Sequence, residues 1–144
     1  MDKLMLRPET AIVKLNSCNT PMKCINSDAP ALAIIKKEQG EDKLIDIIMS
    51  WVIELNDFLN ISRKMNPPQV KQTSVMIMSD FYFMNIADIN LVFSRAKKGY
   101  YGIMYESLDG SKIYSWFDQY ATERAQTAFD DNLNEHIQLK EKRL

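Results

Sequence analysis

The chain of 144 residues has the composition of a single globular domain. Hydrophobic residues make up 46% and charged residues 26%, close to the average for globular proteins, which argues against a wholly disordered chain. Eighteen basic and 19 acidic side chains give a net charge of −1, so no overall positive charge draws the protein to nucleic acid or anionic lipid. One histidine and two cysteines exclude most histidine-based catalysis and any four-ligand Cys/His zinc site.

The first 27 residues are rich in turn and loop formers, and we expect them to form a flexible N-terminal arm with at most a short helix around Glu9–Leu15. The beginning of the sequence lacks the apolar core of a signal peptide, and no stretch is apolar enough to span a membrane. We therefore expect a cytoplasmic protein that does not engage a membrane. In that compartment Cys18 and Cys24 are expected to be free thiols.

Residues 28–60 predict two helices. Asp28 and Pro30 resemble a helix start, followed by residues 31–37, and Gly40 separates this segment from the next. Residues 41–60 carry the clearest amphipathic pattern of the chain. Its apolar positions follow the i, i+3, i+4, i+7 rule: Leu44, Ile47, Ile48, Trp51, Leu55, Phe58 and Leu59. Trp51 is therefore expected in the core.

Three further helices follow. Pro67 and Pro68 suit the first turn of a helix that runs to about Asp80. Asn85 is expected to cap the next helix, which ends at Gly99 after the cations of its last turn. Residues 100–106 are expected to be extended or a small strand. Asp109 then caps a last helix whose apolar stripe is Ile113, Trp116, Phe117 and Tyr120.

The pattern as a whole predicts an all-α protein, a compact bundle of about five helices. The expected organisation is a flexible arm over residues 1–27, a helical domain over 28–130, and a polar tail over 131–144 that is either helical or frayed. No internal repeat is present.

The sequence predicts no enzyme. Neither a glycine-rich nucleotide loop nor a P-loop is present, and no serine stands in a nucleophile elbow. Pairs of carboxylates such as Asp80 and Asp88, or Glu54 and Asp57, are better explained as caps and solvated helix faces, and His136 lies in the polar tail. We therefore expect no catalytic residues, no metal and no cofactor.

One cluster of residues is a candidate for partner binding. It joins three cations to two adjacent aromatic rings at a helix end, and cations with stackable rings suit phosphate and base contacts as well as protein hot spots. The alternative is that the cations compensate the helix dipole and that the tyrosines pack beneath the next helix. The candidate residues are Arg95, Lys97, Lys98, Tyr100 and Tyr101.

The same region resembles an uncharacterised family of small helical proteins from anaerobic gut bacteria, their phages and mobile elements. The resemblance covers residues 30–128, most tightly 80–124. The same region is more distantly similar to phage proteins that load or inhibit a replicative helicase. The resemblance rests on the segments Asp80–Phe93, Arg95–Gly102, Tyr105–Gly110 and Ile113–Tyr120, and on Glu123-Arg124.

The resemblance implies a non-enzymatic accessory protein of phage or mobile-element DNA replication that binds a replicative helicase or related replication protein, with residues 95–102 as its contact surface. Two alternatives stay open: a nucleic-acid-binding module that uses the 95–101 patch, and a phage protein that modulates host defence.

Overall fold

The computed structural model describes residues 7–102 and 107–143, which form seven helices and contain no strand beyond two isolated bridges. The all-α prediction is confirmed, although the number of helices exceeds the expected five. The helices are α1 (Pro8–Leu15), α2 (Pro21–Ile25), α3 (Leu32–Gln39), α4 (Glu41–Phe58), α5 (Pro67–Asp80), α6 (Ile86–Lys97) and α7 (Gly110–Arg143). The segment expected to be extended, residues 100–106, forms a turn at Tyr100–Tyr101, and its residues 103–106 lie outside the described range.

Helix α6 is the centre of the fold. Nine of its 12 residues are buried, and a helix that is apolar on nearly all sides must be surrounded by others. Its start is a capping box, in which the Asn85 side chain accepts from the backbone N–H of Asp88 and the Asp88 side chain accepts from that of Asn85. Its end is followed by Gly99 at φ 78°, a conformation that favours glycine. Both predicted ends are confirmed.

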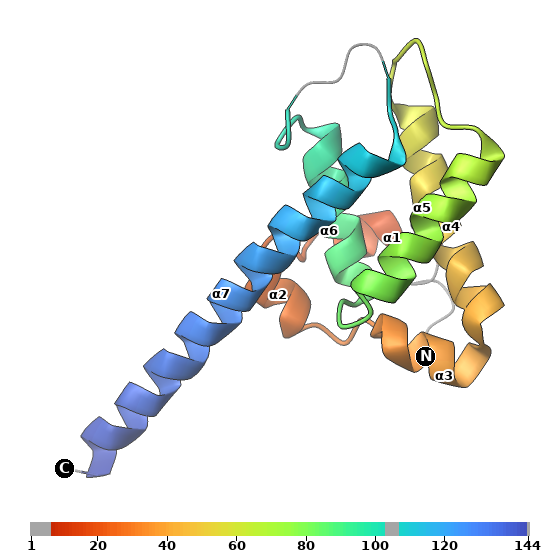
Figure 1. Cartoon of the computed structure of the whole chain (residues 1–144). Helices are drawn as coiled ribbons and strands as arrows, with labels where there is room; N and C mark the ends of the chain where they lie inside the picture. Colours follow the sequence, from red (N-terminus) through yellow and green to blue (C-terminus); the bar gives the residue numbers. More distant parts are fainter. Residues whose placement is uncertain (1–6, 103–106, 144) are drawn as a thin grey trace.

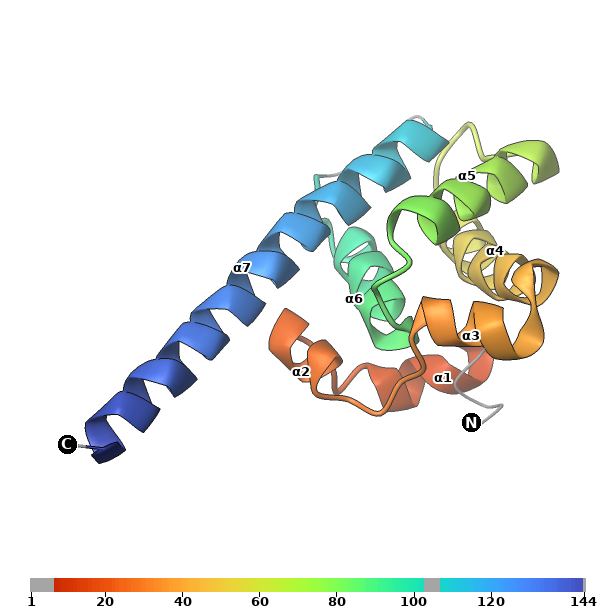
Figure 2. The same cartoon turned by 60° about the horizontal axis from the view of Figure 1, so that its bottom comes forward.

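Helices α1 and α2 belong to the packed domain, contrary to the expected arm over residues 1–27. Ala11, Leu15 and Cys24 are buried within the core, and Figures 1 and 2 both place α1 and α2 beside α6. The sequence conceals this packing because each helix is too short to display a full apolar stripe and the loop between them is polar. The helical domain thus begins within the first 27 residues.

Helix α7 begins in close contact with α5. A Cβ atom on Gly110 would lie 2.5 Å from Oγ1 of the buried Thr73, so only glycine allows α7 to begin there without a shift. Asp109 caps the helix by accepting from the backbone N–H of Lys112 at 3.0 Å, as expected. In the first half of α7 the buried residues are Ile113, Trp116, Phe117 and Tyr120.

The second half of α7 projects from the domain. Every residue from 129 to 143 is exposed, and both views show this end of the helix pointing away from the other helices. At 1.5 Å per residue this part is about 22 Å long. Of the two forms expected for residues 131–144, the helical one is therefore found up to Arg143. No helix in the described ranges is both long and apolar enough to cross a membrane.

Candidate functional site

The five residues of the predicted patch lie together at the end of α6, but their roles differ. Arg95 makes a bidentate contact with Glu123 of α7, with its two terminal nitrogens 2.6 and 3.2 Å from the carboxylate oxygens. Its guanidinium also lies 4.5 Å from the centre of the Tyr100 ring. Arg95 therefore joins α6 to α7 and its charge is neutralised within the domain.

Lys97 is likewise held inside the protein. Its Nζ lies 2.7 Å from Oε1 of Glu54 on α4 and 5.1 Å from the centre of the Phe58 ring. The ring of Tyr101 stacks on Trp116 with the centroids 5.8 Å apart, and burial raises the pKa of this tyrosine. Lys98 and Tyr100 are the two exposed members of the patch. The structure thus combines both interpretations of the sequence: three residues tie the helices together and two face solvent.

The two adjacent lysines are expected to respond differently to charge reversal. Lys97→Glu places a second carboxylate beside Glu54 in a contact where the two side chains are only 17% and 30% exposed, so it should lower the free energy of unfolding by about 1–3 kcal/mol. Lys98→Glu should change it by less than about 0.5 kcal/mol, because the side chain is exposed. Urea unfolding followed by circular dichroism measures both values. Equal effects would contradict the assignment of Lys97 as the structural member of the pair.

A pocket of about 250 Å³ lies beside this patch, between α1, α4 and α6. Its apolar walls include Trp51, Phe58 and Phe93, and the side chains of Lys97 and Lys98 line it as well. Two amide side chains also line it, Asn16 just after α1 and Asn90 on α6, and Ile12 and Ser94 complete the lining. The patch that the sequence indicated is therefore one edge of a concave surface, whose other edge comes from the segment expected to be a flexible arm.

Side-chain hydrogen bonds run along this pocket in one direction. The indole N–H of Trp51 donates to Oδ1 of Asn90 at 3.4 Å, and Nδ2 of Asn90 donates to Oδ1 of Asn16 at 3.1 Å. Trp51 is 1% and Asn90 4% exposed. The partners are far apart in the sequence, so no local motif could have revealed the contact.

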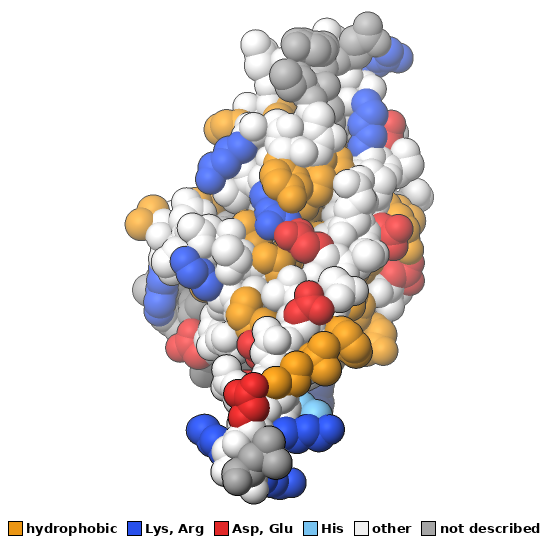
Figure 3. Space-filling model, turned by 90° about the vertical axis from the view of Figure 1, so that its left-hand side faces the viewer, with side chains coloured by type: hydrophobic (Ala, Val, Ile, Leu, Met, Phe, Trp, Pro, Cys, Tyr) orange, Lys and Arg blue, Asp and Glu red, His pale blue; other side chains and the backbone are white. Residues whose placement is uncertain are grey.

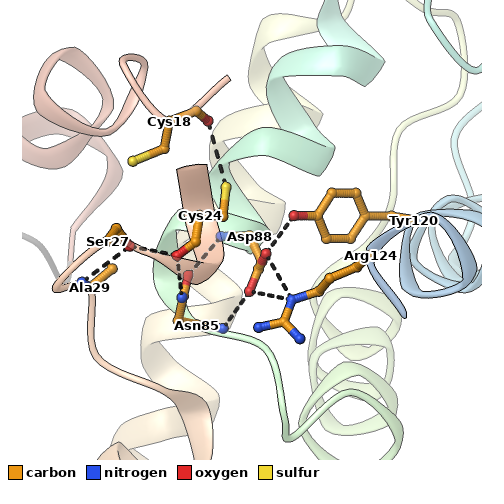
Figure 4. A network of polar contacts seen from close by, with 8 residues as sticks. All are labelled: Cys18, Cys24, Ser27, Ala29, Asn85, Asp88, Tyr120 and Arg124. Carbon is orange, nitrogen blue, oxygen red and sulfur yellow. Dashed lines mark hydrogen bonds and ion pairs between the residues drawn. The ribbon is translucent and has the colours of Figure 1, made fainter. Parts of the chain in front are cut away.

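A second polar network lies buried between α2, α6 and α7 (Figure 4). Its centre is Asp88, which is 0% exposed. Its Oδ1 accepts from the hydroxyl of Tyr120, and its Oδ2 accepts from the backbone N–H of Asn85 at 2.8 Å. Both oxygens accept from Nε of Arg124 at 3.2 Å. Burial, together with the adjacent Asp88 charge, raises the pKa of Tyr120, so this hydroxyl remains a donor.

The network extends to α2 through Asn85, whose Nδ2 donates to the carbonyl of Cys24 at 2.9 Å. Cys18 and Cys24 are free thiols. Burial raises the pKa of Cys24 to about 12, and because the thiolate is the reactive form, this thiol is inert near neutral pH. Within the part of the chain that the structure describes, no group of three or more His, Cys, Asp or Glu residues could hold a metal ion.

Three of the four carboxylates considered for acid/base pairs have structural partners. Asp80 accepts from the hydroxyl of Tyr114 at 2.7 Å, Asp88 is enclosed by the network above, and Glu54 pairs with Lys97. In the sequence the apolar pattern of the last helix continues weakly to Phe129, but Phe129 is 62% exposed on the projecting end of α7, and Leu133 and Ile137 are 46% and 45% exposed. Their spacing of four residues was visible in the sequence, but their exposure depends on where the domain ends.

The chain was compared with protein-family models, curated proteins and solved structures, and none of them matches it.

Proposed function

We propose that this is a non-enzymatic accessory protein that binds a partner protein through the projecting end of α7, and that the partner is a replicative helicase or related replication protein of a phage or mobile element. The observation that carries the proposal is the apolar stripe of Phe129, Leu133 and Ile137 on a helix segment whose residues 129–143 are all exposed. On the face shown in Figure 3, hydrophobic side chains form a run above the charged tip of the molecule.

The stripe is not a continuation of the core. At about 100° per residue, the nine positions from Tyr120 to Phe129 turn the side chain by roughly 180°, to the opposite side of the helix. Residues that lie on the core-facing side further along α7 are polar, among them Asp131, Asn134 and Gln138. Phe129 and Leu133 are therefore turned away from this domain and Ile137 lies on the adjoining flank, an apolar stripe that suits the groove of another protein.

The energetics of the segment point the same way. Residues 129–143 continue a helix of 34 residues without tertiary packing of their own, and exposed Phe, Leu and Ile side chains add little stability where they stand. A partner that offers an apolar groove would bury three side chains spaced by four residues, the pattern of helix-in-groove recognition. The identity of the partner rests on the resemblance of residues 80–124. Lys98 and Tyr100 remain candidates for a second contact, whereas the pairing of Arg95 and Lys97 with glutamates disfavours a nucleic-acid site there.

The test compares two triple variants of the full chain. Phe129→Gln, Leu133→Gln and Ile137→Gln remove the apolar stripe while keeping a good helix former. The matched control carries Asp131→Gln, Asn134→Gln and Lys142→Gln on the other side of the same segment. Binding is measured with the purified replicative helicase encoded by the same genome. We expect the stripe variant to bind at least tenfold more weakly and the control to bind like the unaltered chain.

Three outcomes would contradict the proposal. Equal binding by the stripe variant would remove α7 as the contact, and absence of helicase binding by the unaltered chain would remove this partner. A third outcome, in which affinity purification recovers nucleic acid with a log–log salt slope near −2 to −3, would favour the alternative of a nucleic-acid-binding module.

A further inference from the structure

The volume of the pocket between α1, α4 and α6 limits the size of any ligand that it can hold. Its volume of about 250 Å³ lies below the roughly 300–1,000 Å³ of pockets that hold drug-sized ligands. Trp51 and Phe93 are each 1% exposed and offer an apolar floor, while Phe58 is 57% exposed at the rim. A single aromatic ring or a branched aliphatic group fits this space.

The chain of hydrogen bonds determines which side-chain atoms donate and which accept at the edge of the pocket. An indole nitrogen can only donate, so Asn90 must accept from Trp51 through Oδ1 and can donate only through Nδ2. Asn16 must then accept through its own Oδ1. Its Nδ2 is left with two N–H donors, and in the described ranges nothing accepts from them. The open end of the chain is therefore a donor.

The charged side chains at the pocket, like the free amide donor, favour a negatively charged ligand. Glu54 neutralises Lys97, but Lys98 is exposed and has no carboxylate partner in the part of the chain that is described. The side chains that line the pocket thus bring one uncompensated positive charge and a free amide donor to an apolar pocket, and the hydroxyl of Ser94 can donate as well. A negatively charged acceptor on a small apolar group complements both features, and a cation or a donor complements neither.

We propose that this pocket is a binding site for small apolar carboxylates, with the ring or aliphatic group against Trp51 and Phe93 and the carboxylate bound by Asn16 Nδ2 and Lys98. The site goes beyond the proposed function, because it lies on α1, α4 and α6 and uses no residue of α7. The same chemistry is found in a free aromatic acid and in the terminal carboxylate of a chain that ends in an apolar residue.

The experiment uses three probes of similar shape and different charge: phenylacetate, phenylacetamide and benzylamine. Each is titrated into the full chain and followed by NMR through the indole N–H signal of Trp51 and the side-chain amide signals of Asn16 and Asn90. We expect phenylacetate to bind on the order of tenfold more tightly than phenylacetamide, because charge-assisted hydrogen bonds are about twice as strong as neutral ones, and benzylamine not to bind.

The decisive variant is Asn16→Asp, which has nearly the same shape. Its carboxylate still accepts from Asn90 but presents a negative charge in place of the free donor, so it should abolish the preference for phenylacetate. Lys98→Gln should reduce that preference several-fold. The control is Asn26→Asp, because Asn26 is also the exposed residue that caps the end of a short helix, α2, and does not line the pocket. It should bind phenylacetate like the unaltered chain.

The proposal is overturned if none of the three probes shifts these signals, if the amide or the amine binds as tightly as the acid, or if Asn16→Asp leaves the preference unchanged. An acetylated peptide ending in phenylalanine with a free carboxylate identifies the source of the ligand. Tighter binding of the peptide than of phenylacetate assigns the site to chain termini, and the reverse order assigns it to free acids. The α7 stripe variant retains this pocket and should bind phenylacetate like the unaltered chain. A failure of the helicase experiment therefore does not affect the test of the pocket.

Discussion

Replacing Asp88 with alanine is expected to lower the free energy of unfolding by about 3–5 kcal/mol. The substitution removes the carboxylate that accepts from Tyr120, Arg124 and the backbone N–H of Asn85. It leaves the Arg124 guanidinium, whose side chain is only 18% exposed, without its counter-charge, and it removes half of the capping box of α6. Because small domains have only about 5–15 kcal/mol of stability, urea unfolding should show a large shift of the midpoint.

A double-mutant cycle distinguishes the loss of the charge pair from the loss of packing. Arg124→Met removes the guanidinium while keeping an unbranched side chain of similar length. If the pair is the source of the effect, Asp88→Ala combined with Arg124→Met should be destabilised by less than the sum of the single variants, with a coupling of about 1–3 kcal/mol. Additive effects, or a loss below about 1 kcal/mol for Asp88→Ala, would show that the network does not hold α6 against α7.

Replacing Trp51 with alanine is expected to lower the free energy of unfolding by about 3–5 kcal/mol. The reason is that the indole is 1% exposed in the core between α4 and α6. Trp51→Phe keeps most of the apolar contact and removes only the N–H. That variant leaves Oδ1 of the buried Asn90 without its donor, which should cost about 1–3 kcal/mol. Thermal or urea unfolding measures both.

Trp116→Ala provides the comparison, since this indole is 4% exposed and stacks on Tyr101. It should lose a similar 3–5 kcal/mol without any effect on the pocket. If Trp51→Phe lowered the free energy of unfolding as much as Trp51→Ala, the hydrogen bond and not the apolar contact would dominate at this position. That result would contradict the expectation that the loss of apolar contact causes most of the destabilisation.

Local signals in the sequence were sufficient for the longer helices. The apolar stripe of residues 41–60, the Asn85 cap and Gly99 each act within one or two turns. The structure confirms the cap, the glycine and the stripe up to Leu55, whereas Phe58 is 57% exposed and the helix ends there. The burial of Trp51 and Trp116 followed from the same periodicity and is also confirmed. The packing of α1 and α2 could not be derived in this way, because a helix of five or eight residues is stabilised mainly by tertiary contacts.

The candidate surfaces were predictable only in part. The positions of Arg95 and Lys97 at a helix end were clear, but their partners Glu123 and Glu54 lie 28 and 43 residues away, and nothing local predicts such pairs. Asn16 and Asn90 are separated by 74 residues. Periodicity places a side chain on a face of its own helix, whereas the partner of that face depends on how the helices pack.

The 34 residues of α7 are under two different structural constraints. Up to Tyr120 a substitution must preserve the packing against α5 and α6, and a side chain at Gly110 would require a shift at Thr73. From residue 129 to residue 143 no side chain is buried, so a change there has little effect on folding. Among related sequences, apolar residues that persist at positions 129, 133 and 137 while their neighbours vary would therefore record selection for binding alone.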